Sequence, residues 1–319
     1  YERFVGPEDH WLPPDHFQES PRGQVAHHTS PTNIAFLLLS GVAASDLGYI
    51  GLLGLALRMN ATLGSLNGLE RHRGHFLNWY DTRTLAPLPP RYVSTVDSGN
   101  LAGCLIALSQ ACLAIPDMYV FRWERWQGLL DTLGLLGEGL QAADDKENPS
   151  PLHAALADAR RQILAVKDEP QRWLQVLEEL SHDALPEIDR CLMELIEVRP
   201  HALTPEALDG LRLCSERVRH HVMSMRREIE LLVPWAALLE KPPALFAESE
   251  SEAWRALVDV LPVAPCLGQI PEASRAADGR LEVLRSLLVE GASSSGTEVD
   301  RNLADAQTWC AQLAEALLS

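Results

Sequence analysis

The spacing of apolar residues between positions 52 and 69 constrains the fold most strongly. Leucine and methionine recur there at intervals of three and four: Leu52, Leu55, Met59, Leu63, Leu66 and Leu69. Side chains at this spacing lie on one stripe of an α-helix, which is buried against a neighbouring element. We therefore expect a helix over residues 52–70. Comparable patterns fill most of the chain and strand signals are nearly absent, so we expect an all-α protein.

Two further helices are expected in the first 120 residues. Ser30 is a good N-cap and Pro31 suits the first helical position, so one helix begins there, and Gly48 can end it. Another helix begins near Ser98, with Asp97 or Ser98 as its cap.

From residue 121 onward the pattern stays helical, without a fixed repeat. The expected helices cover residues 121–142, 151–166, 169–197, 205–240, 250–261, 272–290 and 298–318. Polar or proline-containing breaks separate some of them: Asp144–Pro151, Arg199–Thr204 and Gly291–Thr297. Within the first of these helices, Trp123 and Trp126 with Arg122 and Arg125 are expected to build a helix-packing face.

Charge divides the chain unevenly. Residues 1–120 carry 7 basic and 10 acidic side chains, and residues 121–319 carry 20 and 34, which gives a formal net charge of −17 over 319 residues. An acidic surface repels phosphate backbones, so nucleic-acid binding is not expected. The contrast favours two domains, residues 1–120 and an acidic helical bundle over residues 121–319.

Cysteine usage and hydropathy bear on the compartment. The six cysteines are far apart and form no CxxC pair, so we expect free thiols in a reducing compartment. The longest apolar stretch, Ile34–Ala44, is shorter than the roughly 20 residues that span a bilayer. We therefore expect no direct membrane insertion by this segment. The chain shows no signal peptide and starts with Tyr1 rather than Met, so we expect it to be part of a longer protein.

Residues 72–103 combine aromatic rings with hydrogen-bonding side chains, although only 6% of the chain is aromatic. The segment contains Trp79, Tyr80 and Tyr92 beside Asn78, Asp81, Asp97, Ser98 and Asn100. Sugars stack their C–H faces on aromatic rings and replace hydration of their hydroxyls with hydrogen bonds. A carbohydrate-binding loop is one interpretation. A buried aromatic corner that anchors a long loop is the other, and Asp97 and Ser98 could simply cap a helix.

The order of the expected helices predicts where this loop lies. Short connections favour antiparallel packing, so the starts of the first and third helices and the end of the second share one end of the bundle. The segment His27–Asn33 would then lie beside the Trp79–Asn100 loop, with the short link Gly48–Gly51 at the opposite end. Two long loops on one rim are typical of a helical barrel or half-barrel with its site at one end.

No catalytic, metal or cofactor signature stands out. Four histidines lack the spacing of metal ligands and are expected to make loop hydrogen bonds or to contact a polar ligand: His27, His28, His72 and His75. The carboxylates near the rim form no recognisable glycosidase pair, and the sequence shows no nucleophile triad or phosphate loop. We assign no catalytic residue, no metal and no cofactor.

Several unusual motifs occur in order within residues 1–115. They read WLPPD (11–15), FQ (17–18), AH (26–27), TSPTNI (29–34), GHF (74–76), NWYDT (78–82) and YVSTVDSGNLAG (92–103). Together they resemble one region of the bacterial cyclic β-1,2-glucan synthases, at the start of the middle, glucoamylase-like domain. Residues 121–319 resemble the more variable helical segment that follows there.

This resemblance implies a fold and a setting. Residues 1–120 would be the N-terminal part of an incomplete (α/α) barrel, or toroid, and residues 121–319 an insertion or linker. The synthases join a UDP-glucose-dependent glycosyltransferase, this middle domain linked to transglycosylation and a phosphorylase-like domain in one inner-membrane protein. The implied location is the cytoplasmic side of the inner membrane, and the implied partners are a β-1,2-glucan chain and the other domains of the parent synthase.

The resemblance also implies a binding role without catalysis. The family's catalytic glutamates lie beyond the similar region, so the isolated chain is expected to show no turnover. What carries over is a glucan-binding rim: Asp15, Gln18, Thr32, Asn33, Asn78, Trp79, Tyr80, Asp81, Asp97, Ser98 and Asn100. His16, His28, Ala35 and Leu77 replace the usual Asn, Arg, Gly and Tyr, which is expected to alter glucan affinity more than fold.

Two other functions stay open. The acidic, motif-free half would suit a non-catalytic helical scaffold or docking module of a large membrane-associated carbohydrate enzyme. A free-standing β-1,2-glucanase-like hydrolase would need a complete catalytic pair within the chain. An unfinished barrel is also expected to expose apolar surface, and hence to be poorly soluble or to self-associate.

Overall fold

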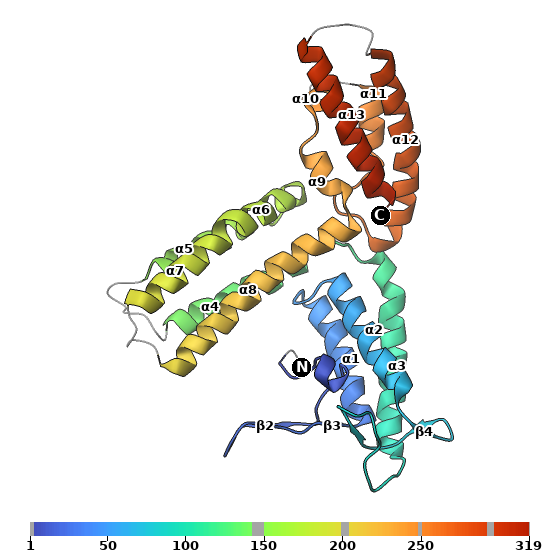
Figure 1. Ribbon diagram of the computed structural model, residues 1–319, viewed down its shortest axis with the longest axis vertical. Coiled ribbons are helices and arrows are strands. Elements are labelled where there is room, and N and C mark those ends of the chain that lie inside the picture. The colour runs from blue at the N-terminus through green and yellow to red at the C-terminus, as the bar shows by residue number, and fades with distance from the viewer. Residues whose placement is uncertain (1–2, 142–149, 199–203, 248–250, 292–296, 319) are drawn as a thin grey trace. The chain divides into compact units, whose positions relative to one another are not determined.

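The computed structural model describes residues 3–141, 150–198, 204–247, 251–291 and 297–318. The chain divides into two compact units, Tyr1–Ile115 (unit 1) and Pro116–Ser319 (unit 2). Helices make up most of the described residues, and the strands among them are each two residues long (Figure 1). The predicted all-α class is therefore confirmed.

Unit 1 is built on three helices. Its elements are η1 (Pro7–Asp9), β1 (Phe17–Gln18), β2 (Gln24–Val25), β3 (His28–Thr29), α1 (Pro31–Asp46), α2 (Leu52–Gly68), β4 (Arg71–His72), β5 (His75–Phe76), β6 (Tyr80–Asp81) and α3 (Thr95–Ala114). Helix α1 packs against both α2 and α3, which lie side by side with it in Figure 1. The core joins the three helices to the N-terminal loop and to the loop between α2 and α3. Its buried residues are Leu12, Ile34, Ala35, Leu38, Leu66, Leu69, Leu77, Tyr80, Leu101 and Leu108.

The first helix begins where the sequence predicts. The Ser30 hydroxyl accepts a hydrogen bond from the Asn33 N–H at 3.3 Å, and Pro31 occupies the first helical position. Just beyond its end, Gly48 adopts a left-handed conformation with φ of 81°, which suits glycine because it lacks a Cβ. The second helix, α2, ends at Gly68, close to the predicted end.

The third helix, α3, begins earlier than predicted. It starts at Thr95, and Ser94 is its cap: the Ser94 hydroxyl accepts from the Asp97 N–H at 3.2 Å. The prediction of Asp97 or Ser98 as the cap was wrong. Asp97 lies inside the first turn, and its carboxylate accepts from Thr32 of α1 instead.

Helix α3 also corrects the expectation about apolar stretches. Residues Thr95–Asp117 are long and apolar enough to cross a membrane by length and composition alone, and an 18-residue stretch within them has a mean hydropathy of 1.5. Interspersed glycine, serine and cysteine hid this length in the sequence. Only 11% of the stretch is buried, and Val96, Ile106 and Leu113 are 70%, 68% and 69% exposed. The expected exposure of apolar surface is found here.

Unit 2 is mainly helical in its described residues, where β-structure is limited to the isolated bridge between Tyr119 and Cys266. Its longer elements are α4 (Trp123–Gln141), α5 (Pro151–Ala165), α6 (Trp173–Glu179), α7 (Leu185–Val198), α8 (Pro205–Leu232), α9 (Trp235–Glu240), α10 (Ala244–Ala247), α11 (Glu252–Val258), α12 (Ile270–Gly291) and α13 (Thr297–Leu318). Helix α4 packs against α8 and α5, while α13 packs against α12, α9 and α10. The predicted breaks fall wholly or partly outside the described residues: Asp144–Pro151, Arg199–Thr204 and Gly291–Thr297.

The tryptophans of α4 build a packing face, as predicted. Trp126 is fully buried, and its ring centroid lies 5.7 Å from that of Phe121 and 6.3 Å from that of Trp173. Trp123 packs at the edge of the same cluster. Arg125 is only 1% exposed and lies 3.9 Å from the carboxylate of Glu228 on α8.

Two prolines interrupt patterns that the sequence presented as continuous helices. Pro186 follows a π-helical turn, Leu180–Ala184, because proline lacks an N–H and its ring clashes with the carbonyl four residues earlier. Pro234 separates α8 from α9. The predicted helices over 169–197 and 205–240 are therefore each divided.

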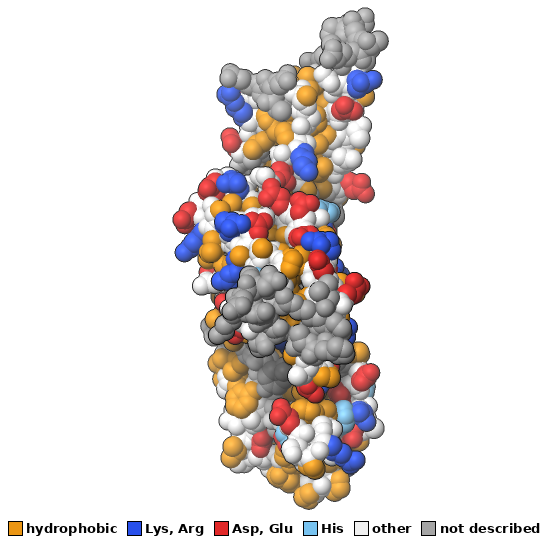
Figure 2. Space-filling model, turned by 90° about the vertical axis from the view of Figure 1, so that its left-hand side faces the viewer, with side chains coloured by type: hydrophobic (Ala, Val, Ile, Leu, Met, Phe, Trp, Pro, Cys, Tyr) orange, Lys and Arg blue, Asp and Glu red, His pale blue; other side chains and the backbone are white. Residues whose placement is uncertain are grey.

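Charged side chains of both signs are interspersed over the region of α5–α8 (Figure 2). Many pair within one helical turn, as Arg190 does with Glu187 and Glu194. Such exposed pairs contribute little stability. All six cysteines are free, as predicted, with Cys191 and Cys310 buried.

Candidate functional site

The N-terminal loop and the loop after α2 meet at one end of unit 1. Strand β3 pairs antiparallel with β6, which places His28 opposite Asp81 and Thr29 opposite Tyr80. The Thr82 N–H also donates to the His27 carbonyl at 3.1 Å. The prediction that these two loops share one rim is confirmed.

Asn78 is the centre of the polar contacts on this rim. Its amide lies 2.8 Å from the Tyr92 hydroxyl, and the surrounding donors and acceptors assign the orientation in which the amide nitrogen faces Asp97. In that orientation the amide donates to Asp97 Oδ2 at 2.9 Å and accepts from Trp79 Nε1 at 2.9 Å and from the Tyr92 hydroxyl at 2.8 Å. Asn78 itself is only 5% exposed. The indole of Trp79 is therefore held in one orientation by a buried amide.

The same network continues into α1 and α3. The Thr32 hydroxyl donates to Asp97 Oδ1 at 2.7 Å and accepts from the Asn100 amide at 3.1 Å. Thr32 lies in the first turn of α1, and Asp97 and Asn100 lie in the first two turns of α3. The Asn78 network, which we define as Thr32, Asn78, Trp79, Tyr92, Asp97 and Asn100, thus joins two helix starts to the loop between α2 and α3.

A second group of polar contacts surrounds Asp15. Its carboxylate accepts from the Asn33 amide at 2.9 Å and from His16 Nδ1 at 2.9 Å, and His28 Nε2 lies 3.8 Å away. The His28 ring meets Trp79 edge to face, with 5.1 Å between the centroids. His28 therefore lies between Asp15 and the Trp79 ring.

Asp9 ties the two loops together and was not singled out by the sequence. Its carboxylate, buried with 6% exposure, accepts from His27 Nδ1 at 2.8 Å and from the Thr82 hydroxyl. Arg83 reaches the other nitrogen of His27 at 2.8 Å, so His27 makes loop hydrogen bonds, as predicted. An aspartate between Glu8 and a histidine carries no motif that would have revealed this role.

Some predicted rim residues turn away from solvent. Tyr80 is fully buried, and its hydroxyl accepts from the Leu77 N–H and donates to the Glu70 carbonyl, both at 2.7 Å. Burial raises the pKa of this phenol. The Ser98 hydroxyl is also buried. Tyr80 therefore supports the loop from inside, whereas the Ser98 hydroxyl makes no hydrogen bond to any residue that the structure describes.

Two further predicted residues have local roles. Asp81 accepts from the N–H groups of Arg83 and Thr84, at 3.0 and 2.8 Å, and so shapes the turn that follows β6. Gln18 lies exposed in the β1–β2 hairpin, where its amide donates to the Ser20 carbonyl. Neither joins the Asn78 network or the contacts around Asp15.

The accessible part of the rim combines rings with polar edges. Trp79 is half-buried and Tyr92 is 45% exposed, while Asp15 and Asn33 are half-buried and Asn100 is exposed. Oriented rings beside acceptors and amide donors suit an uncharged, hydroxyl-rich ligand. Tyr92, which the predicted rim omitted, belongs here because its hydroxyl contacts Asn78.

The carboxylates of the rim are suited to accepting hydrogen bonds. Burial opposes ionisation of Asp15, but hydrogen bonds from His16 and Asn33 outweigh it and hold its pKa below the usual range. Burial likewise opposes ionisation of Asp81, and hydrogen bonds from Thr84 hold that pKa low. A general acid needs a raised pKa. Within the described residues, no three His, Cys, Asp or Glu side chains cluster as a metal site.

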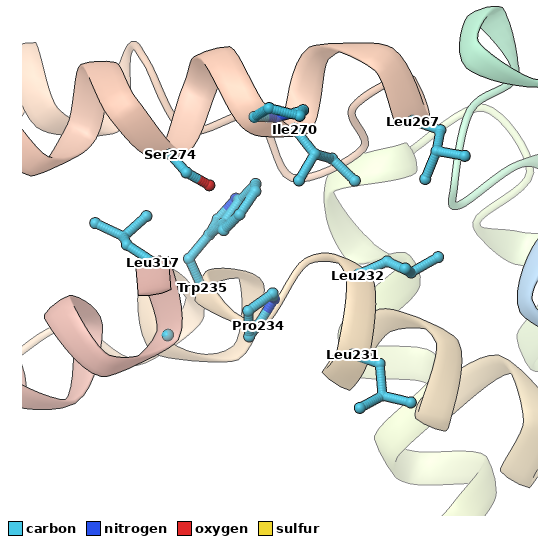
Figure 3. Close-up of a pocket in the computed structure, with 10 residues that line it drawn as sticks. Leu231, Leu232, Pro234, Trp235, Leu267, Ile270, Ser274 and Leu317 are labelled. Carbon is cyan, nitrogen blue, oxygen red and sulfur yellow. The ribbon is translucent and has the colours of Figure 1, made fainter. Parts of the chain in front are cut away.

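Unit 2 contains an open groove of about 370 Å³. Figure 3 shows Trp235 of α9 between Ile270 and Ser274 of α12 and Leu317 of α13. The indole N–H of Trp235 is already bonded to the Pro262 carbonyl at 3.0 Å. Apart from the Ser274 hydroxyl, the side chains that line the groove are apolar, so this groove does not suit a sugar.

The comparisons with known proteins agree with the motifs. No family model matches the chain. In an alignment over 181 residues that covers 53% of the chain, it is 41% identical to the cyclic β-(1,2)-glucan synthase NdvB of Rhizobium meliloti (strain 1021). The matched stretch makes up 6% of that protein. The resemblance predicted from the motifs is confirmed, and the chain is similar to a small segment of a cyclic β-1,2-glucan synthase.

Proposed function

We propose that unit 1 supplies part of a glucan-binding site within a cyclic β-1,2-glucan synthase, a glycosyltransferase and transglycosylase of β-1,2-glucan. The observation that carries this proposal is the orientation of the Trp79 ring by the buried Asn78 amide. A ring held in place before binding loses little freedom when a sugar stacks on it. The similarity to NdvB supports β-1,2-glucan as the ligand.

The contacts divide between stacking and hydrogen bonding. A glucose ring lies on Trp79, with Tyr92 as a second aromatic contact. Asp15 keeps lone pairs for sugar hydroxyls, and the exposed Asn100 side chain adds an amide at the start of α3. Asp97, Thr32 and Asn78 act by positioning these groups, because their own hydrogen bonds are made to one another.

The proposal includes the setting of the chain. Residues 1–120 form the N-terminal part of a glucoamylase-like (α/α) barrel, and residues 121–319 form an insertion or linker. The parent works at the cytoplasmic side of the inner membrane, and its other domains are partners of this segment. The lowered pKa values of Asp15 and Asp81 suit acceptors of sugar hydroxyls better than general acids.

Isothermal titration with β-1,2-gluco-oligosaccharides tests this proposal. Trp79→Ala is expected to weaken binding about tenfold, or about 1.4 kcal/mol, because the stacking surface is lost. Tyr49→Ala is a matched control, since Tyr49 is 45% exposed in the link between α1 and α2, at the far end of the helices. Equal affinities of wild type and Trp79→Ala would remove Trp79 from the site. Release of reducing sugar from β-1,2-glucan would instead favour a hydrolase.

A scaffold or docking module is the second candidate. The exposed apolar side chains of α3 favour it, because such patches mark surfaces that contact other protein. A chain that binds no gluco-oligosaccharide but co-purifies with a neighbouring domain of the synthase would support this function over the first.

A further inference from the structure

The turn at His10 and Trp11 has an unusual backbone. Both residues adopt the left-handed region, with φ of 52° and 59°, although neither is glycine or asparagine. Side chains with a Cβ rarely occupy this region because the Cβ approaches the carbonyl oxygen. Two in succession occur only where surrounding contacts determine them, and such strain clusters at functional sites.

The surrounding contacts come from α2 and from the rim. The Thr62 hydroxyl, in a residue only 3% exposed, donates to the Trp11 carbonyl at 3.0 Å, and the Ser65 hydroxyl donates to the His10 carbonyl. The His10 ring is bonded to the Thr82 carbonyl at 2.9 Å. The turn is therefore fixed on one side by α2 and on the other by the loop that carries Trp79.

The result of this turn is an outward-facing tryptophan. Trp11 is 36% exposed, whereas the next residue, Leu12, is fully buried in the core of unit 1. Within the residues that the structure describes, no hydrogen bond to the Trp11 indole is found. An indole that is about one-third exposed, with an unbonded N–H, thus belongs to a turn that is bonded to the loop carrying Trp79.

We infer that Trp11 is a second aromatic platform for the same glucan chain, distinct from the platform at Trp79. This inference rests on the proposed function. In this inference each platform contacts a different glucose unit. The Trp11 indole N–H donates to a hydroxyl of the unit that stacks on the ring, and the strained turn holds the ring outward before the chain arrives.

The test compares short and long β-1,2-gluco-oligosaccharides by isothermal titration on the full chain. Trp11→Ala is expected to weaken binding of long chains by about three- to tenfold and to leave the shortest chain that binds unchanged. Trp79→Ala weakens both. Trp11→Phe restores part of the affinity for long chains. Thr62→Val, which keeps the indole but releases its backbone, is expected to weaken binding of long chains only, by a smaller factor.

Three results would overturn the inference. Unchanged affinity of Trp11→Ala at every length would remove Trp11 from the site and leave the role of Trp79 standing. An equal loss for short and long chains would show that Trp11 acts on the Trp79 platform and forms no platform of its own. Absence of binding by the wild-type chain would overturn this inference together with the proposed function.

Discussion

Replacement of Asn78 by alanine tests whether one buried amide holds the rim together. The side chain is only 5% exposed and bonds to Asp97, Trp79 and Tyr92. The bond to the Asp97 carboxylate involves a charged acceptor, which is worth about 1.5–3 kcal/mol. The Trp79 N–H and the Tyr92 hydroxyl lie near solvent and can rehydrate, so they add little. We expect unit 1 to lose about 2 kcal/mol of unfolding free energy.

Hydrogen exchange followed by mass spectrometry is the suitable assay, because it reports on unit 1 separately from unit 2. Peptides from α1 and α3 should show an opening free energy lower by about 2 kcal/mol, and the melting temperature of unit 1 should fall by roughly 8 °C. Glucan affinity should fall with it, since the Trp79 ring loses its hydrogen bond. Tryptophan fluorescence anisotropy would report greater mobility of the Trp79 indole.

Asn60→Ala is the matched control. Asn60 is exposed on α2, and a surface substitution there should change stability by no more than about 0.5 kcal/mol. If Asn78→Ala and Asn60→Ala gave the same opening free energies, the hydrogen bonds of Asn78 would contribute nothing to stability, and the argument that a buried amide orients Trp79 would fail.

Three further predictions concern charge and surface. Arg125→Met should destabilise unit 2 by about 3–5 kcal/mol in urea denaturation, because it removes the buried cation that lies 3.9 Å from the Glu228 carboxylate; adding Glu228→Leu should recover much of this loss, and strict additivity would contradict the pairing. The Asp15 carboxyl should titrate below 3.8 by NMR and move upward in Asn33→Ala. Because its folded pKa is depressed, its contribution to stability is present above pH 3.8 and is lost as pH falls through the lower folded value; an unshifted titration would refute this. Ile106→Glu should reduce self-association in sedimentation velocity, because this exposed side chain belongs to the apolar surface of α3; a monomeric wild type would contradict the idea.

The sequence predicts well what depends on neighbouring residues. Ser30 and Pro31 specify the start of α1 locally, and the structure follows them. The start of α3 differs because Ser94, Asp97 and Ser98 are all good caps, so local preference does not choose among them. Which residue caps α3 depends on Thr32, sixty-five positions before Asp97. The Thr32 hydroxyl donates to the Asp97 carboxylate, and Ser94 caps the helix.

Long-range polar pairing is where sequence reasoning fell short. Asp9 bonds to Thr82 across 73 positions, and no periodicity or spacing encodes such a contact. Helix geometry did predict that the two loops meet, because only the order and length of helices are needed for that. The role of Tyr80 could not be predicted either. An aromatic residue among polar neighbours can be a stacking surface for a sugar or part of the core, and the burial of Tyr80 in the structure shows that it belongs to the core.

Three carboxylates join the segments of the rim above the apolar core of unit 1. Asp9 joins the N-terminal loop to Thr82, Asp15 joins that loop to Asn33 of α1, and Asp97 joins α3 to α1. Each is a charged acceptor whose bonds are stronger than those between neutral groups. Replacing any of these three aspartates should therefore lower both the unfolding free energy of unit 1 and its affinity for glucan. Replacing the rings that they orient should lower affinity alone, because a half-exposed ring contributes little to folding.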